Sequence, residues 1–412
     1  MKFKDSLPAK IALIGLLALL MLIPLSMVQK QIGDRQSAAY ASEDEVASSW
    51  GRSQTLSGPF LKLSYDVEVQ DGQKTSLKNE TDRVYPGSLS YDVDIATQIL
   101  HRSIYDVTVY RSEVVVEGDF VIPAAYAEKE LTAQSVAMGL SDLRGIDGPV
   151  EITLGGRQYA FHSGSAGNGT DASLSEPVVL DPALMDGSTK VPFRLTYSVR
   201  GSSSLMVKPY GGTTEVRMHS NCPDPSFKGD FLPAEREVRE DGFDARWSVS
   251  EINRGKPDDT SFGVTLLQGV TQYQETMRSA KYGILIILLV FIAGLAVELV
   301  GKKKINPVQY LVIGLSLVLF YALVLSFSEF MNFTLAYCIA AVMTTGALFG
   351  YFRGILHDRS AWLLTALVAL AYLLSYVLLQ MKSYALITGT LVLFALLACV
   401  MFLTRNLNKV EE

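Results

Sequence analysis

Three carboxylates occupy positions where they could take part in chemistry. Glu298 lies inside an apolar run, Glu329 lies in a short connection between two apolar runs, and Asp230 lies in the proline-rich stretch NCPDPSFKGDFLP. Carboxylates that converge across a cleft can act as general acid and base. A carboxylate inside a membrane is costly to bury and is often functional. We therefore treat Asp230, Glu298 and Glu329 as the candidate functional residues.

For each glutamate, a structural role is the competing interpretation. Glu298 precedes Lys302 by four residues, and side chains at this spacing can pair on one face of a helix. Near the end of a span, a long charged side chain can also extend towards the membrane surface. Glu329 has no comparable local partner. The sequence therefore favours a structural role for both glutamates, more strongly for Glu298 than for Glu329.

The proline-rich stretch is predicted to be a rigid connection and not an active-site loop. Pro223, Pro225 and Pro233 each fix one backbone dihedral and remove one amide donor. Such a segment cannot belong to a central strand, so we expect either a connection that runs along the surface or a crossover connection. Phe227 and Phe231 can anchor it to a hydrophobic core, and the aspartates can bond nearby backbone amides.

Other nucleophiles and metal ligands form no recognisable constellation. Ser226 and Lys228 lack the Gly-x-Ser-x-Gly turn of a hydrolase, and Cys222 has no neighbouring cysteine to form a CxxC pair. The four histidines are dispersed, without metal-ligand spacing. Gly155-Gly156 and Gly164–Gly169 lack the Gly-Lys-Ser/Thr of a phosphate-binding loop, and the Gly- and Ser-rich residues 154–177 predict a mobile loop. The sequence therefore predicts no catalytic, metal or cofactor site.

Hydropathy places these residues in a membrane protein. The chain of 412 residues is 49% hydrophobic and has a mean hydropathy of +0.24. A first apolar run, preceded by three lysines, covers residues 11–28. Five further runs follow, at roughly residues 282–300, 308–327, 333–351, 361–379 and 384–403. Each run approaches the length of about 20 residues that a helix needs to cross the hydrocarbon core of a membrane.

The first run is predicted to be an uncleaved anchor helix. The apolar region of a signal peptide is typically about 7–15 residues long, which is shorter than this run. A small-residue cleavage site exists around Ala39 and Ala41, but it lies well beyond the end of the run. Cleavage is the alternative interpretation. The polar residues 30–52 contain helix formers and no proline, and we expect them to continue the anchor helix.

The basic residues predict the orientation of the spans. One set of ends holds most of them: Lys2, Lys4, Lys10, Lys302, Lys303, Lys304, Arg353, Arg359, Arg405 and Lys409. The short connections at the other ends hold Lys382. By the positive-inside rule, both termini are expected in the cytoplasm and residues 29–280 on the outer side of the membrane.

Residues 29–280 are predicted to form a β-rich domain with an antiparallel, sandwich-like arrangement. Apolar and polar side chains alternate over residues 61–70 and again over 193–200, as in strands with one buried face. Asp71-Gly72 supplies a tight turn after the first of these strands. Residues 28–280 carry 24 Lys and Arg against 36 Asp and Glu. This acidic balance excludes nucleic acid as the expected partner.

Several blocks of the sequence resemble the CreD family of bacterial inner-membrane proteins, also described as colicin-tolerance proteins. These blocks are SNCPDPSFKGDFLPAEREV with GFDARW close behind, SDLRGI, NPVQYLVIGLSLVLFYALVLSFSE and MFLTRN. The resemblance spans nearly the whole chain. It implies an inner-membrane protein with a large periplasmic domain and a helical bundle, linked to envelope stress, colicin tolerance and the β-lactam response. It implies no catalytic residue, and Cys222 departs from the aromatic residue expected in the first block.

Together, these observations predict an anchor at residues 1–28, a periplasmic β-rich domain at 29–280, a five-helix transmembrane bundle at 281–404 and a cytoplasmic tail at 405–412. The expected function is that of a non-enzymatic envelope-stress protein, embedded in membrane lipid, whose β-domain binds an envelope protein. The alternative is a membrane enzyme or transporter that acts on a lipid or cell-wall component. In that case Glu298 or Glu329, or Asp230 with its neighbours, would line a cavity at the membrane surface.

Overall fold

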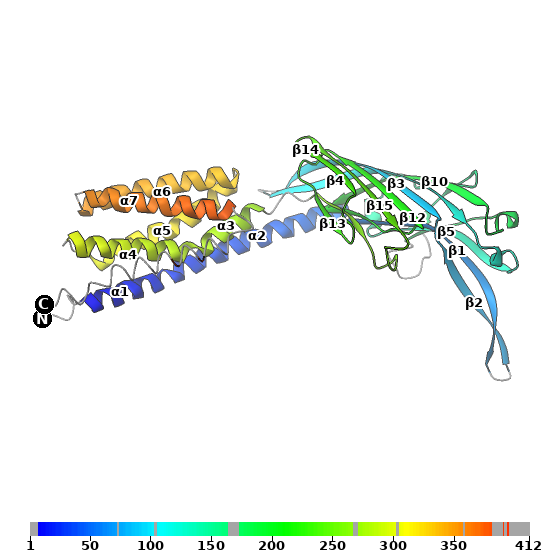
Figure 1. The fold of residues 1–412 in the computed structure, drawn as a ribbon, viewed down its shortest axis with the longest axis horizontal. Helices are drawn as coiled ribbons and strands as arrows, with labels where there is room; N and C mark the ends of the chain where they lie inside the picture. The colour runs from blue at the N-terminus through cyan, green and yellow to red at the C-terminus, as the bar shows by residue number, and fades with distance from the viewer. Residues whose placement is uncertain are drawn as a thin grey trace. The chain divides into compact units, whose positions relative to one another are not determined.

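The computed structural model describes residues 7–71, 74–102, 105–163, 173–266, 271–301, 305–356, 359–380, 390 and 394 (Figure 1). The chain divides into two compact units. We call Met1–Tyr40 together with Val270–Glu412 the helical unit, and Ala41–Gly269 the β unit. The predicted mobile loop at residues 154–177 is wrong for Arg157–Ala160, His162–Ser163 and Leu174–Pro177, which form strands because their backbones pair with neighbouring segments. Residues 164–172 of that stretch lie outside the described residues, as does the predicted span at 384–403 apart from Thr390 and Phe394.

Long helices form the helical unit. They are α1 (Leu7–Leu20), α2 (Leu22–Trp50), α3 (Thr271–Lys281), α4 (Gly283–Gly301), α5 (Pro307–Ser328), α6 (Phe333–Leu356) and α7 (Arg359–Gln380). Among the described residues, five helical segments are long and apolar enough to cross a membrane: Ala9–Trp50, Gln272–Glu298, Pro307–Ser328, Phe333–Leu356 and Arg359–Gln380. The first five spans predicted from hydropathy are therefore confirmed as helices of spanning length.

The N-terminal helix continues far beyond its apolar run. Pro24 has no amide donor and its ring crowds the carbonyl of Leu20, where α1 ends. Hydrogen bonds from the Met21 amide to Leu17 and from the Leu25 amide to Met21 carry the helical path across this break. Because α2 then runs on to Trp50, the predicted continuation of the anchor helix is confirmed.

The remaining helices of this unit form an up-and-down bundle. Contacts join α4 to α5, α5 to α6, α6 to α7 and α7 back to α4, and α1 packs against α4 and α5 (Figure 1). The block that begins NPVQ caps α5. The Asn306 side chain accepts a hydrogen bond from the Val308 amide, and the Gln309 side chain accepts one from the Asn306 amide, which is a capping box.

Two eight-stranded sheets form the β unit. Its strands are β1 (Gln54–Asp71), β2 (Lys74–Val84), β3 (Ser88–Arg102), β4 (Tyr105–Val121), β5 (Leu131–Leu140), β6 (Glu151–Leu154), β7 (Arg157–Ala160), β8 (His162–Ser163), β9 (Leu174–Pro177), β10 (Lys190–Ser202), β11 (Ser204–Val207), β12 (Thr213–Ser220), β13 (Ser226–Gly229), β14 (Glu235–Arg239), β15 (Gly242–Ser250) and β16 (Phe262–Thr265). Short 3-10 segments lie at η2 (Ala124–Tyr126), η3 (Leu143–Gly145) and η5 (Pro182–Leu184).

Most strand pairs are antiparallel, as the sequence predicts. Sheet A has the order β13-β16-β11-β1-β5-β9-β8, with β2 paired to β1, and sheet B has the order β14-β15-β12-β3-β4-β10-β6-β7. Two pairs are parallel, β1 with β11 and β12 with β3. The sequence analysis did not anticipate these parallel pairs, because strand direction depends on the crossovers that join distant strands.

The two sheets share one hydrophobic core. Along β10 the burial alternates residue by residue, so one face of the strand points into the core and the other points to solvent. The Tyr91 hydroxyl, from sheet B, donates to the Gly58 carbonyl of sheet A. The Trp247 ring of sheet B lies 5.8 Å from the Phe262 ring of sheet A. The β unit is therefore a sandwich.

Candidate functional site

Glu298 is buried in the helical unit and forms an ion pair. Its Oε1 atom lies 2.7 Å from Nζ of Lys10, and the two side chains are 6% and 26% exposed, respectively. Lys302, the partner expected from the sequence, lies outside the described residues. The predicted pair with Lys302 therefore stays a prediction, and the structure shows a different partner, Lys10, that no local spacing could indicate.

Glu329 also has a partner from the N-terminal helix. It caps the C-terminal end of α5, and its Oε1 atom lies 3.3 Å from Nε of Arg35. Lys10 and Arg35 are 25 residues apart, which corresponds to roughly 37 Å of helix. Since α4 and α5 are antiparallel neighbours, Glu298 and Glu329 lie at opposite ends of this helix pair. These two glutamates do not form one site.

Asp230 belongs to the β unit and joins two strands. Its side chain accepts a hydrogen bond of 2.9 Å from the Ser261 amide, and its own amide donates to the Ser261 carbonyl. Trp247 donates through Nε1 to the Phe231 carbonyl at 3.2 Å, and the Phe227 ring packs edge-on against Trp247. The stretch leads from β12 of sheet B to β13 of sheet A and back to β14 of sheet B. The predicted crossover is confirmed, and its rigidity stays a prediction.

The block SDLRGI holds the last turn of α2 against the strands of the β unit. Asp142 accepts hydrogen bonds from the amides of Arg52 and Arg144 and pairs with the Arg144 guanidinium at 3.0 Å. Arg144 also donates to the Ser48 carbonyl in the last turn of α2, where a positive charge is favourable. Gln54 donates to the carbonyls of Asp142 and Arg200. We call residues 48–54, residues 141–145 and Arg200 the joint.

Gly51 allows the joint to close. It has a φ of +145°, a region that favours glycine. A Cβ atom at this position would come within 2.6 Å of the Arg200 carbonyl oxygen. Trp50, the residue before it, donates through Nε1 to the Tyr110 carbonyl, and its ring lies 5.2 Å from the Arg200 guanidinium. The conformation that joins α2 to β1 is therefore accessible to glycine and is strained for other residues.

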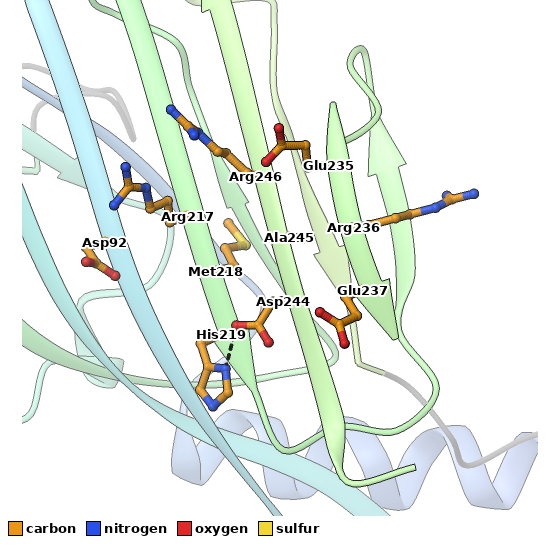
Figure 2. Close-up of a pocket in the computed structure, with 10 residues that line it drawn as sticks. All are labelled: Asp92, Arg217, Met218, His219, Glu235, Arg236, Glu237, Asp244, Ala245 and Arg246. Atoms are coloured by element: carbon orange, nitrogen blue, oxygen red, sulfur yellow. Dashed lines mark hydrogen bonds and ion pairs between the residues drawn. The ribbon is translucent and has the colours of Figure 1, made fainter. Parts of the chain in front are cut away.

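The sequence analysis did not identify a hollow on the outer face of sheet B. Its volume is about 460 Å³, and ten residues from β3, β12, β14 and β15 line it: Asp92, Arg217, Met218, His219, Glu235, Arg236, Glu237, Asp244, Ala245 and Arg246 (Figure 2). Most of these side chains are charged. Since none of them is Ser, Thr, Cys or Tyr, the lining offers no side-chain nucleophile of these types.

The register of the strands arranges the charges in two rows that cross the sheet. The first row is Asp92, Arg217, Arg246 and Glu235. The second row is Asp94, His219, Asp244 and Glu237. Residues two apart on a strand share one face, so the alternation within β12 and β15 puts both rows on the solvent side. We call these eight residues the charged face.

Hydrogen bonds and ion pairs connect three residues of the second row, His219, Asp244 and Glu237, in part through Arg239. His219 Nδ1 lies 2.8 Å from Asp244 Oδ1, and a dashed line marks this contact in Figure 2. Arg239 pairs with Asp244 and, at 3.0 Å, with Glu237. The hydrogen bond from His219 and the one from Arg239 lower the pKa of the Asp244 carboxyl group. This acid is therefore held ionised and is unsuited to donate a proton near neutral pH.

The first row places two like charges side by side. Arg217 faces Arg246 across the β12–β15 pair, an arrangement that is unfavourable unless acids neutralise it. Arg246 pairs with Glu215 at 3.1 Å. The row ends at Glu235 on β14, which is the terminal strand of the sheet. All five residues of β14 are exposed. The charged face thus offers charges of both signs beside an open strand edge.

The described residues contain no group of three or more His, Cys, Asp or Glu side chains that could hold a metal ion. Cys222 is buried in the core of the β unit, where burial raises the pKa of its thiol. The alternating charges of EVRMH and EREVR were visible in the sequence. Their alignment was not, because it depends on which strands pair.

Comparison with known proteins gives one family. The family model described as "Inner membrane protein CreD" matches residues 6–410. The inner membrane protein CreD of Escherichia coli K12 is 32% identical over 423 residues, which cover 95% of this chain and 91% of that protein. An M1 zinc metallopeptidase from Deinococcus radiodurans, solved as a mutant with a bound substrate, is 12% identical, with a TM-score of 0.23 over 44% of this chain and 43% of that chain. A TM-score this low carries no argument.

Proposed function

Because the chain belongs to the CreD family of inner membrane proteins, and is accordingly a multi-pass protein of that membrane, we propose that its β unit is a non-enzymatic binding module for an envelope protein. In this proposal the helical unit anchors the module in membrane lipid. The protein would thereby serve envelope integrity under stress, including tolerance to colicins and the response to β-lactams.

The proposed orientation has both termini in the cytoplasm and residues 29–280 in the periplasm. The distribution of basic residues supports it, with Lys10 at one end of the anchor helix. Two ion pairs support the placement of the anchor helix across the membrane, although they do not distinguish its two sides. Lys10–Glu298 and Arg35–Glu329 are separated by roughly 37 Å of helix, somewhat more than the hydrocarbon thickness of about 30 Å. Charged pairs at this separation can lie at the two surfaces of the membrane, with the anchor helix retained between them.

The charged face is the observation that carries the proposed binding function. Charges of both signs on one exposed face favour a partner with a complementary pattern, since complementarity determines specificity and association rate. The open edge of β14 adds backbone donors and acceptors to which an extended segment can pair. The partner that fits is a polypeptide with both acidic and basic side chains. We therefore assign the charged face as the binding surface.

Site-specific photo-crosslinking in cells tests this assignment. A photoreactive residue placed at Arg217 or Glu235 should give a discrete adduct with one envelope protein, more strongly during β-lactam stress. The matched control is Arg157, which is exposed on β7 at the opposite edge of the same sheet. Adducts equally frequent at all three positions, or absent from Arg217 and Glu235, would reject the charged face as the binding surface.

One observation favours the second candidate function, a membrane enzyme or transporter acting on a lipid or cell-wall component. Glu298 is only 6% exposed inside the helical unit. The variants Glu298→Gln and Glu329→Gln separate the two functions. A catalytic or transport role requires that at least one variant lose the stress phenotype while the protein is present at normal levels. Normal phenotypes for both variants would leave the binding module as the supported function.

A further inference from the structure

One edge of sheet B is a strand whose charges are ordered by face. This strand, β14, ends the sheet, and no described strand pairs with its outer side. Figure 2 shows Glu235 and Glu237 pointing towards the hollow and Arg236 pointing away from it. Residues two apart on a strand share one face, so Arg239 lies on the face of the two glutamates. This face of β14 therefore carries an acid, an acid and a base in that order.

Negative charge predominates where the second row of the charged face meets this edge. The row ends at Glu237, which pairs with Arg239 at 3.0 Å. The same guanidinium also pairs with Asp244 and, at 3.5 Å, with Asp241. One positive charge is thus shared among three carboxylates. The end of the second row therefore favours a further basic group beside Glu237.

The first row meets the edge at Glu235. Its neighbour in the register is Arg246, whose guanidinium pairs with Glu215 at 3.1 Å on the side of the sheet interior. Glu235 itself forms no ion pair with any residue that the structure describes. A basic group on the outer side of β14 would complete the alternation of charge along this row.

The opposite face of β14 carries an exposed apolar side chain. Val238 is 50% exposed, and it is the apolar residue of the strand. Arg236, on the same face, places its guanidinium 6.0 Å from the centre of the Phe227 ring of β13. Arg236 is therefore engaged within the β unit, and Val238 remains available to pack against an apolar residue of an added strand.

Charged side chains on an edge strand discourage pairing with most other strands. They admit a strand with opposite charges at the matching positions, because opposite charges directly across a pair of strands are favourable and like charges are unfavourable. The same residues thus reject one class of segment and accept another. The order of charges on β14 defines the class that it accepts.

We propose that the envelope partner adds an antiparallel strand to β14, with basic residues opposite Glu235 and Glu237 and an acidic residue opposite Arg239. An apolar residue of this strand lies opposite Val238. From its N-terminal end, the segment is acidic, apolar, basic, any residue, basic. The antiparallel direction is the more stable per residue. This inference rests on the binding function proposed for the charged face and specifies the partner's chemistry.

Two synthetic peptides test the inference on the full chain in detergent. One contains Asp-Val-Lys-Thr-Lys between flanking threonines. The other contains Asp-Val-Thr-Lys-Lys, which has the same composition but puts its lysines on opposite faces of a strand. Fluorescence anisotropy should show about three- to tenfold tighter binding of the first peptide. Equal affinities, or no binding of either peptide at about 1 mM, would overturn the inference.

Charge reversal on the protein should reverse this preference. The double variant Glu235→Lys with Glu237→Lys should bind a peptide containing Asp-Val-Glu-Thr-Glu more tightly than the first peptide. The matched control is Glu128→Lys with Glu130→Lys, which makes the same change at the same spacing, at exposed positions between η2 and β5. An equal shift in the control would indicate attraction to charge in general and would reject the added strand. If the test variant does not fold, the two peptides on the wild-type protein decide.

Photo-crosslinking in cells separates this inference from the proposed function. The adduct formed by a photoreactive residue at Arg217 should be lost when Glu235→Lys and Glu237→Lys are introduced. An adduct that persists would reject the added strand and leave the charged face as the binding surface. Absence of adducts from both Arg217 and Glu235 in the otherwise unaltered protein would reject the two together.

Discussion

Nζ of Lys10 lies 2.7 Å from Oε1 of Glu298, so the first helix of the chain is ion-paired to a helix 288 residues away. Glu298 is nearly inaccessible to solvent, and a buried carboxylate without a counter-charge would be strongly unfavourable. The second pair, Arg35 with Glu329, is more exposed on its arginine side. We therefore expect the loss of each pair to lower the free energy of unfolding by a different amount.

Lys10→Met is expected to destabilise the helical unit. The substitution keeps the length of the side chain and removes the positive charge that faces Glu298. Because Lys10 is partly exposed, we expect a loss of about 1–3 kcal/mol in the free energy of unfolding, below the range for fully buried pairs. Denaturant titration of the full-length protein in detergent measures this difference. Adding Glu298→Leu should restore most of the loss, because the buried charge is then gone.

Arg35→Met provides the comparison for this experiment. The Arg35 side chain is 45% exposed, so solvent screens its interaction with Glu329. Its loss should cost less than about 1 kcal/mol. Equal effects of Lys10→Met and Arg35→Met would show that burial of Glu298 does not govern the strength of the first pair.

Asp142 is expected to make the joint sensitive to acid. Burial disfavours ionisation of its carboxyl group, but hydrogen bonds from the Arg144 side chain and from the amides of Arg52 and Arg144 outweigh burial and lower its pKa. A carboxyl group with a lower pKa in the folded state contributes stability above its unfolded value of about 3.9, and this contribution is lost as the pH falls through the folded value. Asp142→Asn should therefore destabilise the protein at neutral pH.

Denaturant titrations of wild-type protein and Asp142→Asn between pH 7 and pH 3 check this prediction. The difference in unfolding free energy should be constant near neutral pH and should shrink below about pH 4. Glu128→Gln, which alters an exposed carboxylate, is the control and should show no such difference. A gap between wild type and Asp142→Asn that stays the same at pH 3 would contradict the role given to the ionised carboxyl group.

Asp230 is expected to have a structural role, as a hydrogen-bond acceptor that stabilises the fold. An asparagine at this position can still accept the hydrogen bond from the Ser261 amide, so Asp230→Asn should leave both stability and the stress phenotype unchanged. Asp230→Ala removes the acceptor and should cost about 1 kcal/mol. Thermal unfolding and β-lactam susceptibility of cells that produce each variant measure these effects. Loss of the phenotype in a stable Asp230→Asn variant would restore this carboxylate as a functional group.

The proposed orientation predicts which side chains a membrane-impermeant reagent can reach. In a background without native cysteines, a Gln98→Cys variant, altered at an exposed position of β3, should react with a charged maleimide in intact cells. A Gly354→Cys variant, altered at the end of α6, should react after lysis and not before. The reverse pattern would place the β unit in the cytoplasm and reject the orientation.

Local patterns in the sequence were sufficient to determine the class of this protein. Apolar runs of spanning length predicted the helices, and the apolar–polar alternation of residues 61–70 and 193–200 predicted strands of the β unit. The proline-rich stretch predicted a connection outside the central strands, and the structure shows a crossover between the two sheets. These predictions succeed because helix burial, strand alternation and proline geometry depend on residues only a few positions apart.

Only the tertiary structure shows which charged residues pair or lie side by side. It joined Glu298 to Lys10 and Glu329 to Arg35, and it aligned Arg217 with Arg246 on neighbouring strands. It also placed Glu298 and Glu329 at opposite ends of the α4–α5 helix pair. Each of these relationships depends on how distant segments pack or on the register in which strands pair. Neither the packing of distant segments nor the register of strand pairing leaves a periodic signal in the sequence. Both depend on contacts between surfaces that only the folded backbone brings together.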